Sequence, residues 1–268
     1  MSSKKHNSTR LLAGVVGNVL EWYDFALYGY LVPVISKLFF PSDNTITSLL
    51  ATFGIFAIGF LMRPLGAVLF GHIGDRFGRR QALYLSIMLM AAPTFLLGCL
   101  PTYASIGVMA AVLLTLLRLV QGLSVGGEFT TSVTYVVETS PTERRGLSGS
   151  WANIGSIGGS LLGVGVAATL TTVLPQSSVE AWGWRIPFLL GGVLGIFALW
   201  LRRNLPESAL FDQQSAEQND EHSDKSPLRA VFTHNRKELI QAILFTSGFC
   251  GATSISAFVS TNRQESST

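Results

Sequence analysis

Charged residues are scarce in this sequence: Asp, Glu, Lys and Arg make up 13% of its 268 residues. An ordinary soluble domain carries about a quarter. Only two cysteines are present, Cys99 and Cys250, and both lie in apolar segments, which excludes a disulfide framework or a cysteine-ligated metal site. The low charge excludes a soluble or nucleic-acid-binding protein and indicates a polytopic helical membrane protein.

Signatures of catalysis are also missing. The four histidines show no nucleophile–base spacing, and no phosphate-binding loop of the ATPase type occurs. The sequence therefore predicts neither an enzyme nor an ATP-driven pump, and it indicates no cofactor and no metal. An integral membrane enzyme ranks third among the possible functions.

Long apolar runs are what the sequence does contain. Each approaches or exceeds the roughly 20 residues that span a bilayer, and none alternates as a membrane barrel requires. We predict an all-α integral membrane protein with helices at residues 11–36, 46–72, 81–100, 107–137, 146–173, 184–201 and 239–259.

Basic residues occupy only every second connection between these helices, whereas the intervening connections have none. By the positive-inside rule, the N-terminus and the connection after residue 201 are cytoplasmic, and the protein lies in the inner membrane. The residues that set this orientation are Lys4, Lys5, Arg10, Arg76, Arg79, Arg80, Arg144, Arg145, Arg202, Arg203, Lys225, Arg229, Arg236 and Lys237.

Composition also divides the chain. The segment "DQQSAEQNDEHSDKSP" is polar and acidic, which is typical of a linker. We therefore predict a cytoplasmic tail at 1–10, a six-helix bundle at 11–203, a cytoplasmic linker at 204–237, a seventh helix at 238–260 and a polar tail at 261–268.

Two carboxylates interrupt the first apolar run, "GNVLEWYDFALYG". A central Asp costs about 2.5–3.5 kcal/mol to insert, so an anchoring helix would not carry Glu21 and Asp24. Spacings of three and four residues put Asn18, Phe25 and Tyr28 on the same face. This face is predicted to line a polar cavity in which protonation neutralises the acids.

The fourth run carries Arg118 and Glu128 deep in the bilayer, with Gln121 three residues after the arginine. Arg118 is expected to pair with Glu21 or Asp24, either to hold the bundle together or to open during a proton-coupled cycle. In other runs, Arg63 and Pro64 are predicted to kink the second helix and anchor it at the interface. Small residues suit the fifth helix to close packing at Gly155, Gly159 and Gly163.

The connection "GHIGDRFGRR" combines glycines, an acid and three arginines. A basic loop touching anionic lipid would need neither the glycines nor the acid. The segment resembles the signature loop of the major facilitator superfamily, and the residues that match are Gly71, Asp75, Arg76, Gly78, Arg79 and Arg80.

Further stretches narrow the resemblance to the metabolite:proton symporters of that superfamily. They are "GFLMRPLGAVLFG", "RLVQGLSVGGEF", "WGWRIPF" and "LRRNLPES". The resemblance implies two six-helix bundles around a central cavity, each made of two inverted three-helix repeats, with this chain supplying the first bundle and the start of a second. It implies that the second bundle is either separately encoded or missing.

The ionisable groups at mid-membrane depth indicate roles in transport, and the resemblance indicates the gate. Proton coupling is expected of Glu21, Asp24 and Glu128, and binding of a small organic acid or zwitterion of Tyr28, Arg118 and Gln121. The loop at 71–80 is expected to form a gate with Glu138, Arg144 and Arg145.

The predicted function is therefore a proton-coupled symporter, with small solutes, protons and the lipid bilayer as partners. The alternative is a non-transporting remnant or a half-length membrane interaction protein.

Overall fold

The computed structural model describes residues 2–203, 205–207 and 240–241, with side chains from Leu11 onward. The chain divides into two units, residues 1–217 and 218–268. The predicted linker, seventh helix and polar tail lie outside the described residues, apart from 205–207 and 240–241. The helices of the first unit run from Ser2 to Arg203.

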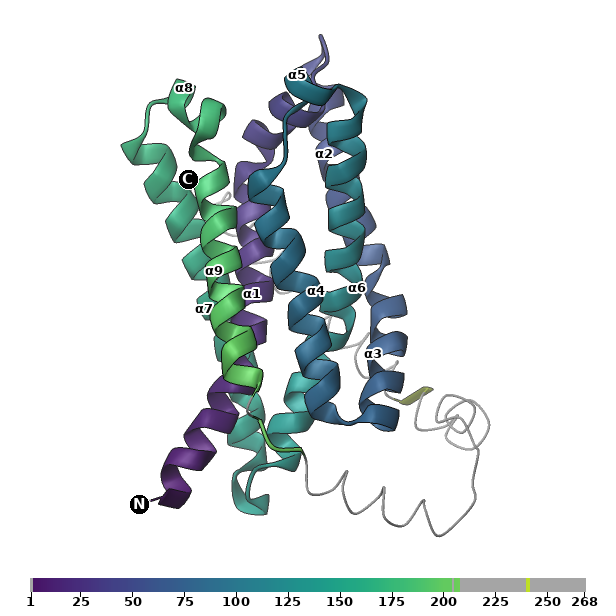
Figure 1. The fold of residues 1–268 in the computed structure, drawn as a ribbon, viewed down its shortest axis with the longest axis vertical. Coiled ribbons are helices and arrows are strands. Elements are labelled where there is room, and N and C mark those ends of the chain that lie inside the picture. Colours follow the sequence, from purple (N-terminus) through teal and green to yellow (C-terminus); the bar gives the residue numbers. More distant parts are fainter. Residues whose placement is uncertain (1, 204, 208–239, 242–268) are drawn as a thin grey trace, which may run out of the picture. The chain divides into compact units, whose positions relative to one another are not determined.

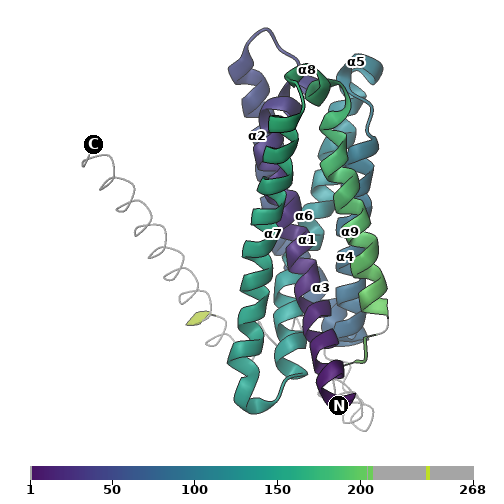
Figure 2. The same cartoon turned by 90° about the vertical axis from the view of Figure 1, so that its left-hand side faces the viewer.

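Every regular element in the described part of this unit is a helix, and the long helices run side by side in both views (Figures 1 and 2). The long ones are α1 (Ser2–Phe39), α2 (Thr45–Leu61), α3 (Arg63–Phe77), α4 (Arg79–Cys99), α6 (Val108–Glu138), α7 (Arg145–Val173) and α9 (Arg185–Arg203). Short connecting turns are α5 (Tyr103–Ile106), η1 (Thr142–Arg144), α8 (Gln176–Ser178) and the π-helical η2 (Val179–Gly183).

The helix boundaries follow local chemistry. Asn44 caps α2 by accepting a hydrogen bond of 2.9 Å from the backbone N–H of Ile46. The predicted second helix is two helices, because the chain breaks at Met62 and Pro64 lies in the first turn of α3, where a missing N–H costs nothing. Helix α1 begins at Ser2 rather than at residue 11, since no proline or glycine interrupts residues 2–10.

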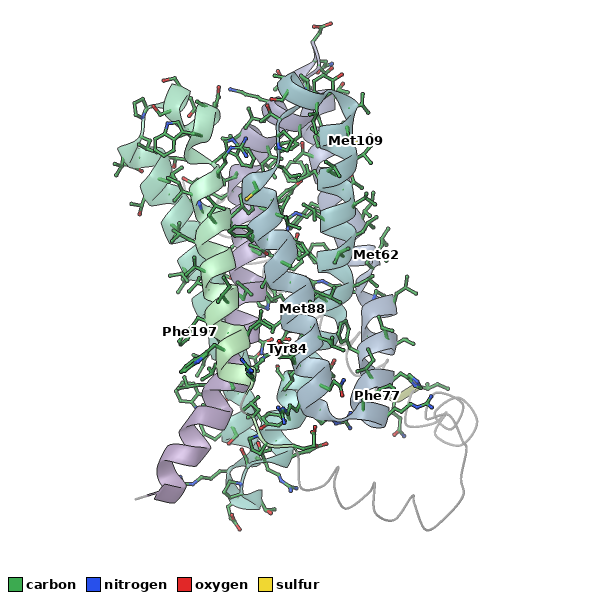
Figure 3. All side chains as sticks on the ribbon, in the orientation of Figure 1. Met62, Phe77, Tyr84, Met88, Met109 and Phe197 are labelled. Atoms are coloured by element: carbon green, nitrogen blue, oxygen red, sulfur yellow. The ribbon has the colours of Figure 1, made fainter. Side chains whose placement is uncertain are left out.

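Five helical stretches of the described chain are long and apolar enough to cross a membrane: Thr45–Phe77, Arg79–Cys99, Val108–Glu138, Thr142–Val173 and Arg185–Arg203. Helix α1 is not among them, because Asn18, Glu21 and Asp24 lie within its apolar part. Large apolar side chains project from the outside of the unit, among them Met88, Met109 and Phe197 (Figure 3). Such a surface fits a lipid environment.

Glycines hold the helices close together. The predicted seam of Gly155, Gly159 and Gly163 is confirmed, because a Cβ atom at any of them would collide with α1. A second seam joins α6 to α2 and α3, where Gly122 faces the backbone of Gly59 and Gly126 faces that of Arg63. Backbones that approach this closely pack the five helices tightly.

One end of the unit is fastened by polar contacts outside the membrane spans. The Lys37 ammonium lies 2.7 Å from a carboxylate oxygen of Glu180. Gln176 donates a second hydrogen bond of 2.8 Å to the same acid. The hydrogen bond from Lys37, followed by that from Gln176, lowers the pKa of Glu180 below its usual value. The carboxylate therefore stays ionised and ties η2 to the end of α1.

Candidate functional site

A buried ion pair joins α1 to α6. Arg118 Nη1 lies 2.5 Å from Asp24 Oδ2, and both side chains are almost completely enclosed. Of the two pairings left open by the sequence, Arg118 forms the one with Asp24. The other carboxylate oxygen accepts hydrogen bonds from Gln121 (3.1 Å) and Thr94 (3.2 Å), so four side chains from three helices form one network.

This network keeps unused hydrogen-bonding capacity. Arg118 Nε and Nη2 and Gln121 Oε1 are buried without a hydrogen-bond partner in the described part of the chain. The Arg118 guanidinium also lies over the Tyr28 ring, 3.8 Å from its centroid. The three residues predicted to bind substrate therefore lie together. A guanidinium with two unpaired donor nitrogens can donate hydrogen bonds to a second carboxylate beside the one that it already binds.

Glu21 lies on the same face of α1 in a different environment. Its side chain is 3% exposed, its Oε2 has no hydrogen-bond partner among the described residues, and Arg63 Nη2 is 3.9 Å from Oε1. That distance is too long for a hydrogen bond. Arg63 lies over the Phe25 and Phe60 rings at 4.5 and 4.1 Å from their centroids. It begins α3 near the middle of the helical stretch Thr45–Phe77, at the break where the sequence predicted a kink.

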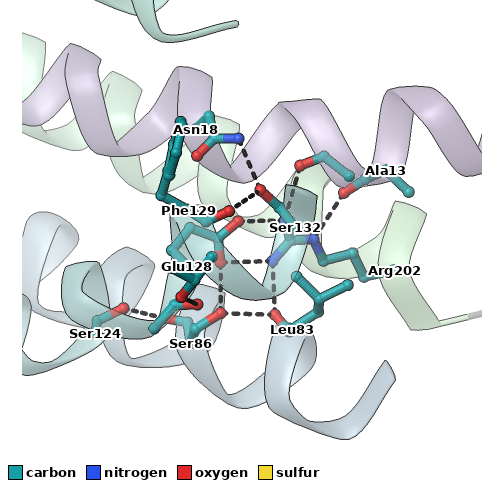
Figure 4. A network of polar contacts seen from close by, with 12 residues as sticks. Ala13, Asn18, Leu83, Ser86, Ser124, Glu128, Phe129, Ser132 and Arg202 are labelled. Carbon is teal, nitrogen blue, oxygen red and sulfur yellow. Dashed lines mark hydrogen bonds and ion pairs between the residues drawn. The ribbon is translucent and has the colours of Figure 1, made fainter. Parts of the chain in front are cut away.

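Glu128 does not share the Asp24 network. It forms an ion pair with Arg202, which is fully buried although the sequence predicted it in a cytoplasmic connection (Figure 4). The guanidinium also donates to the carbonyl oxygens of Ala13 (2.8 Å) and Leu83 (2.6 Å), and Ser86 donates to Glu128. Arg202 is buried because α9 continues to Arg203, which turns this residue toward α1, α4 and α6.

Gly17 makes room for this pair. A Cβ atom at this position would collide with the Glu128 carboxylate and with Arg202 Nη2. Next to it, Asn18 Nδ2 donates a hydrogen bond of 2.9 Å to Ser132 on α6. The Glu128–Arg202 pair thus connects α6 and α9, at a point where α1 has no side chain.

The predicted gate loop is compact. Asp75 pairs with Arg79 at 2.6 Å, and Arg79 Nε lies 3.6 Å from Glu138 at the end of α6. The chain turns from α3 to α4 at Gly78, whose φ of 101° suits glycine. The backbone N–H of Arg80 donates to Glu207 Oε1 at 3.1 Å.

The remaining gate residues surround this turn. Gly71 and Arg76 belong to α3, and Arg76 lies 5.7 Å from the Phe77 ring centroid. The expected ion pairs from Arg144 and Arg145 to the loop do not form among the described residues, where Arg79 is the cation that holds both Asp75 and Glu138.

Four residues of these networks were missed by the sequence prediction: Thr94, Arg63, Arg202 and Glu207. Thr94 gave no signal, since a threonine in an apolar helix is ordinary. Arg63 did give one, because a cation near the middle of a membrane span needs a partner. Arg202 and Glu207 lie in "LRRNLPES", which was used only for the resemblance.

A bundle of membrane-length helices with charges buried at its centre is the architecture of a membrane transporter domain. Sequence comparison makes this specific: residues 11–250 match the sugar (and other) transporter family, and the chain belongs to this family of the major facilitator superfamily.

Relatives in bacteria are similar over most of the chain. It is 40% identical to the glycine betaine/proline/ectoine/pipecolic acid transporter of Dickeya dadantii, over 87% of this chain and 48% of the relative. It is 42% identical to the alpha-ketoglutarate permease of Escherichia coli, over 86% of this chain and 52% of the relative. The chain thus spans about half the length of these relatives.

The fold also matches solved structures. The major facilitator proton:xylose symporter XylE superimposes with a TM-score of 0.72 at 21% identity, over 81% of this chain and 48% of that one. At this identity the likeness establishes the fold alone.

Proposed function

We propose that this chain forms one bundle of a proton-coupled symporter for a small organic acid or zwitterion in the inner membrane. The observation that carries the proposal is the Asp24–Arg118 pair, because the buried guanidinium still has two donors without a partner among the described residues. A substrate carboxylate can occupy those donors and compete with Asp24 for the cation.

Competition between the substrate and Asp24 for Arg118 would couple substrate binding to proton binding. When a substrate carboxylate takes the guanidinium, Asp24 loses its counter-charge in a fully buried position. A buried carboxylate without a counter-charge is costly, and uptake of one proton removes that cost. Substrate and proton are then bound together, which is the condition for symport. Gln121 and Thr94 would stay hydrogen-bonded to the protonated acid.

The names of the relatives support both solute classes, since one is named for betaine and proline and another for alpha-ketoglutarate. All of these solutes carry the carboxylate that Arg118 would bind. The gate proposed for the loop of residues 71–80 is consistent with the ion pairs of Arg79, which can break when the bundle changes its partner contacts.

Transport by cells tests the proposal. The chain is produced in Escherichia coli lacking its own betaine, proline and alpha-ketoglutarate carriers, together with the part of the Dickeya relative that the chain does not match. We expect accumulation of labelled glycine betaine, proline or alpha-ketoglutarate, and its loss on adding a protonophore.

Each polypeptide produced alone, at matched membrane levels, is the control. Uptake that survives the protonophore would contradict proton coupling. No uptake of any of the three solutes, with both polypeptides in the membrane, would favour the non-transporting alternative.

The proposed orientation puts the N-terminus and the 71–80 loop in the cytoplasm and the connection containing Asn44 outside. The alternation of basic connections supports it. In a chain with Cys99 and Cys250 replaced by serine, Asn44→Cys should react with an impermeant maleimide in intact cells, and Gly146→Cys should react only after lysis. The reverse pattern would overturn the orientation.

A further inference from the structure

Four aromatic rings from α1 and α2 form a continuous group, named here the aromatic cluster. Tyr28 stacks on Phe56 with centroids 5.5 Å apart and planes at 8°. The centroid of the Phe56 ring lies 5.6 Å from that of Phe25 and 5.2 Å from that of Phe60. The Phe25 and Phe60 centroids are also 5.2 Å apart. The aromatic cluster therefore links the two helices through ring contacts, in addition to the hydrogen bond of 3.4 Å from the Tyr28 hydroxyl to the carbonyl oxygen of Thr52.

An arginine covers each end of the aromatic cluster, and each arginine has a carboxylate of α1 beside it. At one end Arg118 lies over Tyr28 and is held by Asp24 at 2.5 Å. At the other end Arg63 lies over Phe25 and Phe60, while its only acid among the described residues, Glu21, is 3.9 Å away.

The two ends differ in accessibility and in how well their charges are satisfied. The Arg118 side chain is 3% exposed, whereas Arg63 is 27% and Phe60 42% exposed. Glu21 Oε2 and Arg63 Nε are both buried without hydrogen-bond partners in the described part of the chain. A partly exposed cation near the middle of a membrane span faces water or a polar partner rather than lipid.

We infer that the Arg63 end of the aromatic cluster is a binding site for an organic cation, with Arg63 as its resident occupant. Two ring faces and a carboxylate are the recognition chemistry of an alkylammonium group. A ligand ammonium takes the place of the Arg63 guanidinium over Phe25 and Phe60 and pairs with Glu21. Arg63 swings out toward the exposed side.

This site deepens the proposed function and rests on it. Arg118 would hold the carboxylate of a substrate and the Glu21 end would hold a cation, so the bundle would favour solutes that carry a cation over a dicarboxylate. Glu21 is then the partner of the substrate cation, and Asp24 alone carries the coupling proton. The roles of the two acids, left open by the sequence, are divided between the two ends of the aromatic cluster.

Binding to the purified chain in detergent tests the site without any transport. The probe is tetramethylammonium chloride, which has a cation and no carboxylate, with sodium chloride at equal ionic strength as the reference. The measured quantity is the tetramethylammonium concentration that gives half of the maximal rise in the unfolding temperature of the chain. We expect tetramethylammonium to raise that temperature and sodium to leave it unchanged.

Variants at the Arg63 end give the decisive comparison. Arg63→Gln removes the competing cation and should strengthen tetramethylammonium binding roughly tenfold. Arg63→Lys keeps a cation and should stay close to the parent. Glu21→Gln should weaken binding about tenfold, and Phe60→Leu should weaken it about threefold. Phe197→Leu, which removes an outward-facing ring of α9 stacked on Trp200, is the matched control and should change nothing.

Equal binding by the parent and by both Glu21→Gln and Phe60→Leu would overturn the site, as would the absence of binding by a folded Arg63→Gln chain. Failure here is separate from failure of the proposed function. A chain that supports proton-driven uptake but binds tetramethylammonium independently of Glu21 would be a carrier without this cation site.

Discussion

Asp24→Asn is expected to retain solute exchange and to lose proton-driven accumulation. The amide oxygen can still accept the hydrogen bonds from Thr94 and Gln121, which hold the native side chain at 3.2 and 3.1 Å. It neither competes as an anion for Arg118 nor takes up a proton. Substrate therefore still binds and crosses, but without an accompanying proton.

The expected loss of accumulation follows from the size of the proton gradient. One pH unit corresponds to about 1.36 kcal/mol, which supports roughly tenfold accumulation for one coupled proton. In vesicles containing both polypeptides, the parent should approach that ratio and Asp24→Asn should stay near one. Counterflow of preloaded solute measures exchange in the same vesicles.

Three variants complete this experiment. Asp43→Asn removes an exposed carboxylate from the connection before α2 and should behave like the parent. Asp24→Glu keeps a titratable group and should retain part of the accumulation. Glu21→Gln should retain the coupling to protons for whatever solute it still carries. Full accumulation by Asp24→Asn would show that this acid only holds α1 to α6.

Arg202→Gln is expected to destabilise the bundle far more than Arg203→Gln, although the two arginines are adjacent. Removing one partner of a buried ion pair costs about 3–5 kcal/mol, because the remaining charge is left without compensation. Arg202 also donates to the carbonyls of Ala13 and Leu83, which would lose their partner. Arg203 is exposed, and in the described part of the chain its backbone carbonyl accepts a hydrogen bond from Arg80.

The measurement is the midpoint of thermal unfolding in detergent, where Arg202→Gln should lower the midpoint by about 10 °C. Glu128→Gln should have a similar effect. The double variant should cost less than the sum of the two by at least about 1 kcal/mol, because the residues contact each other. Equal midpoints for Arg202→Gln and Arg203→Gln would contradict the structural role of the pair.

A variant that leaves every charge in place provides an independent check. Gly17→Ala should also lower the midpoint, because its methyl group would occupy the space of the Glu128–Arg202 pair. Gly29→Ala, in the same helix, meets nothing within 4 Å and should be neutral or slightly stabilising, since alanine favours helix over glycine.

The sequence predicted the helices of the first unit and a buried ion pair between Arg118 and an acid of α1, because both depend on local patterns. Apolar runs define spans, and a polar face at helical spacing defines what points inward. The sequence could not predict that Arg118 pairs with Asp24 rather than Glu21, because the pairing depends on how closely and at what height α6 packs against α1. Close approaches at Gly14 and Gly17 of α1, which face Val136 and Glu128 of α6, set that packing.

The partner of Glu128 was missed for a different reason. The positive-inside rule counts every arginine near a helix end as cytoplasmic, so it treats Arg202 and Arg203 alike. One residue along a helix is a rotation of about 100°. At the last turn this rotation decides which of the two is enclosed by α1, α4 and α6, and no periodic pattern continues beyond α9 to reveal it.

The contact between Glu128 and Arg202 also has a consequence in time. The two residues are 74 positions apart, and chains are synthesised at about 5–20 residues per second. The acid of α6 is therefore made about 4 to 15 seconds before its arginine. During that interval the Glu128 side chain has no arginine partner, so it is expected to be protonated or hydrated. Its counter-charge arrives only when α9 has been made.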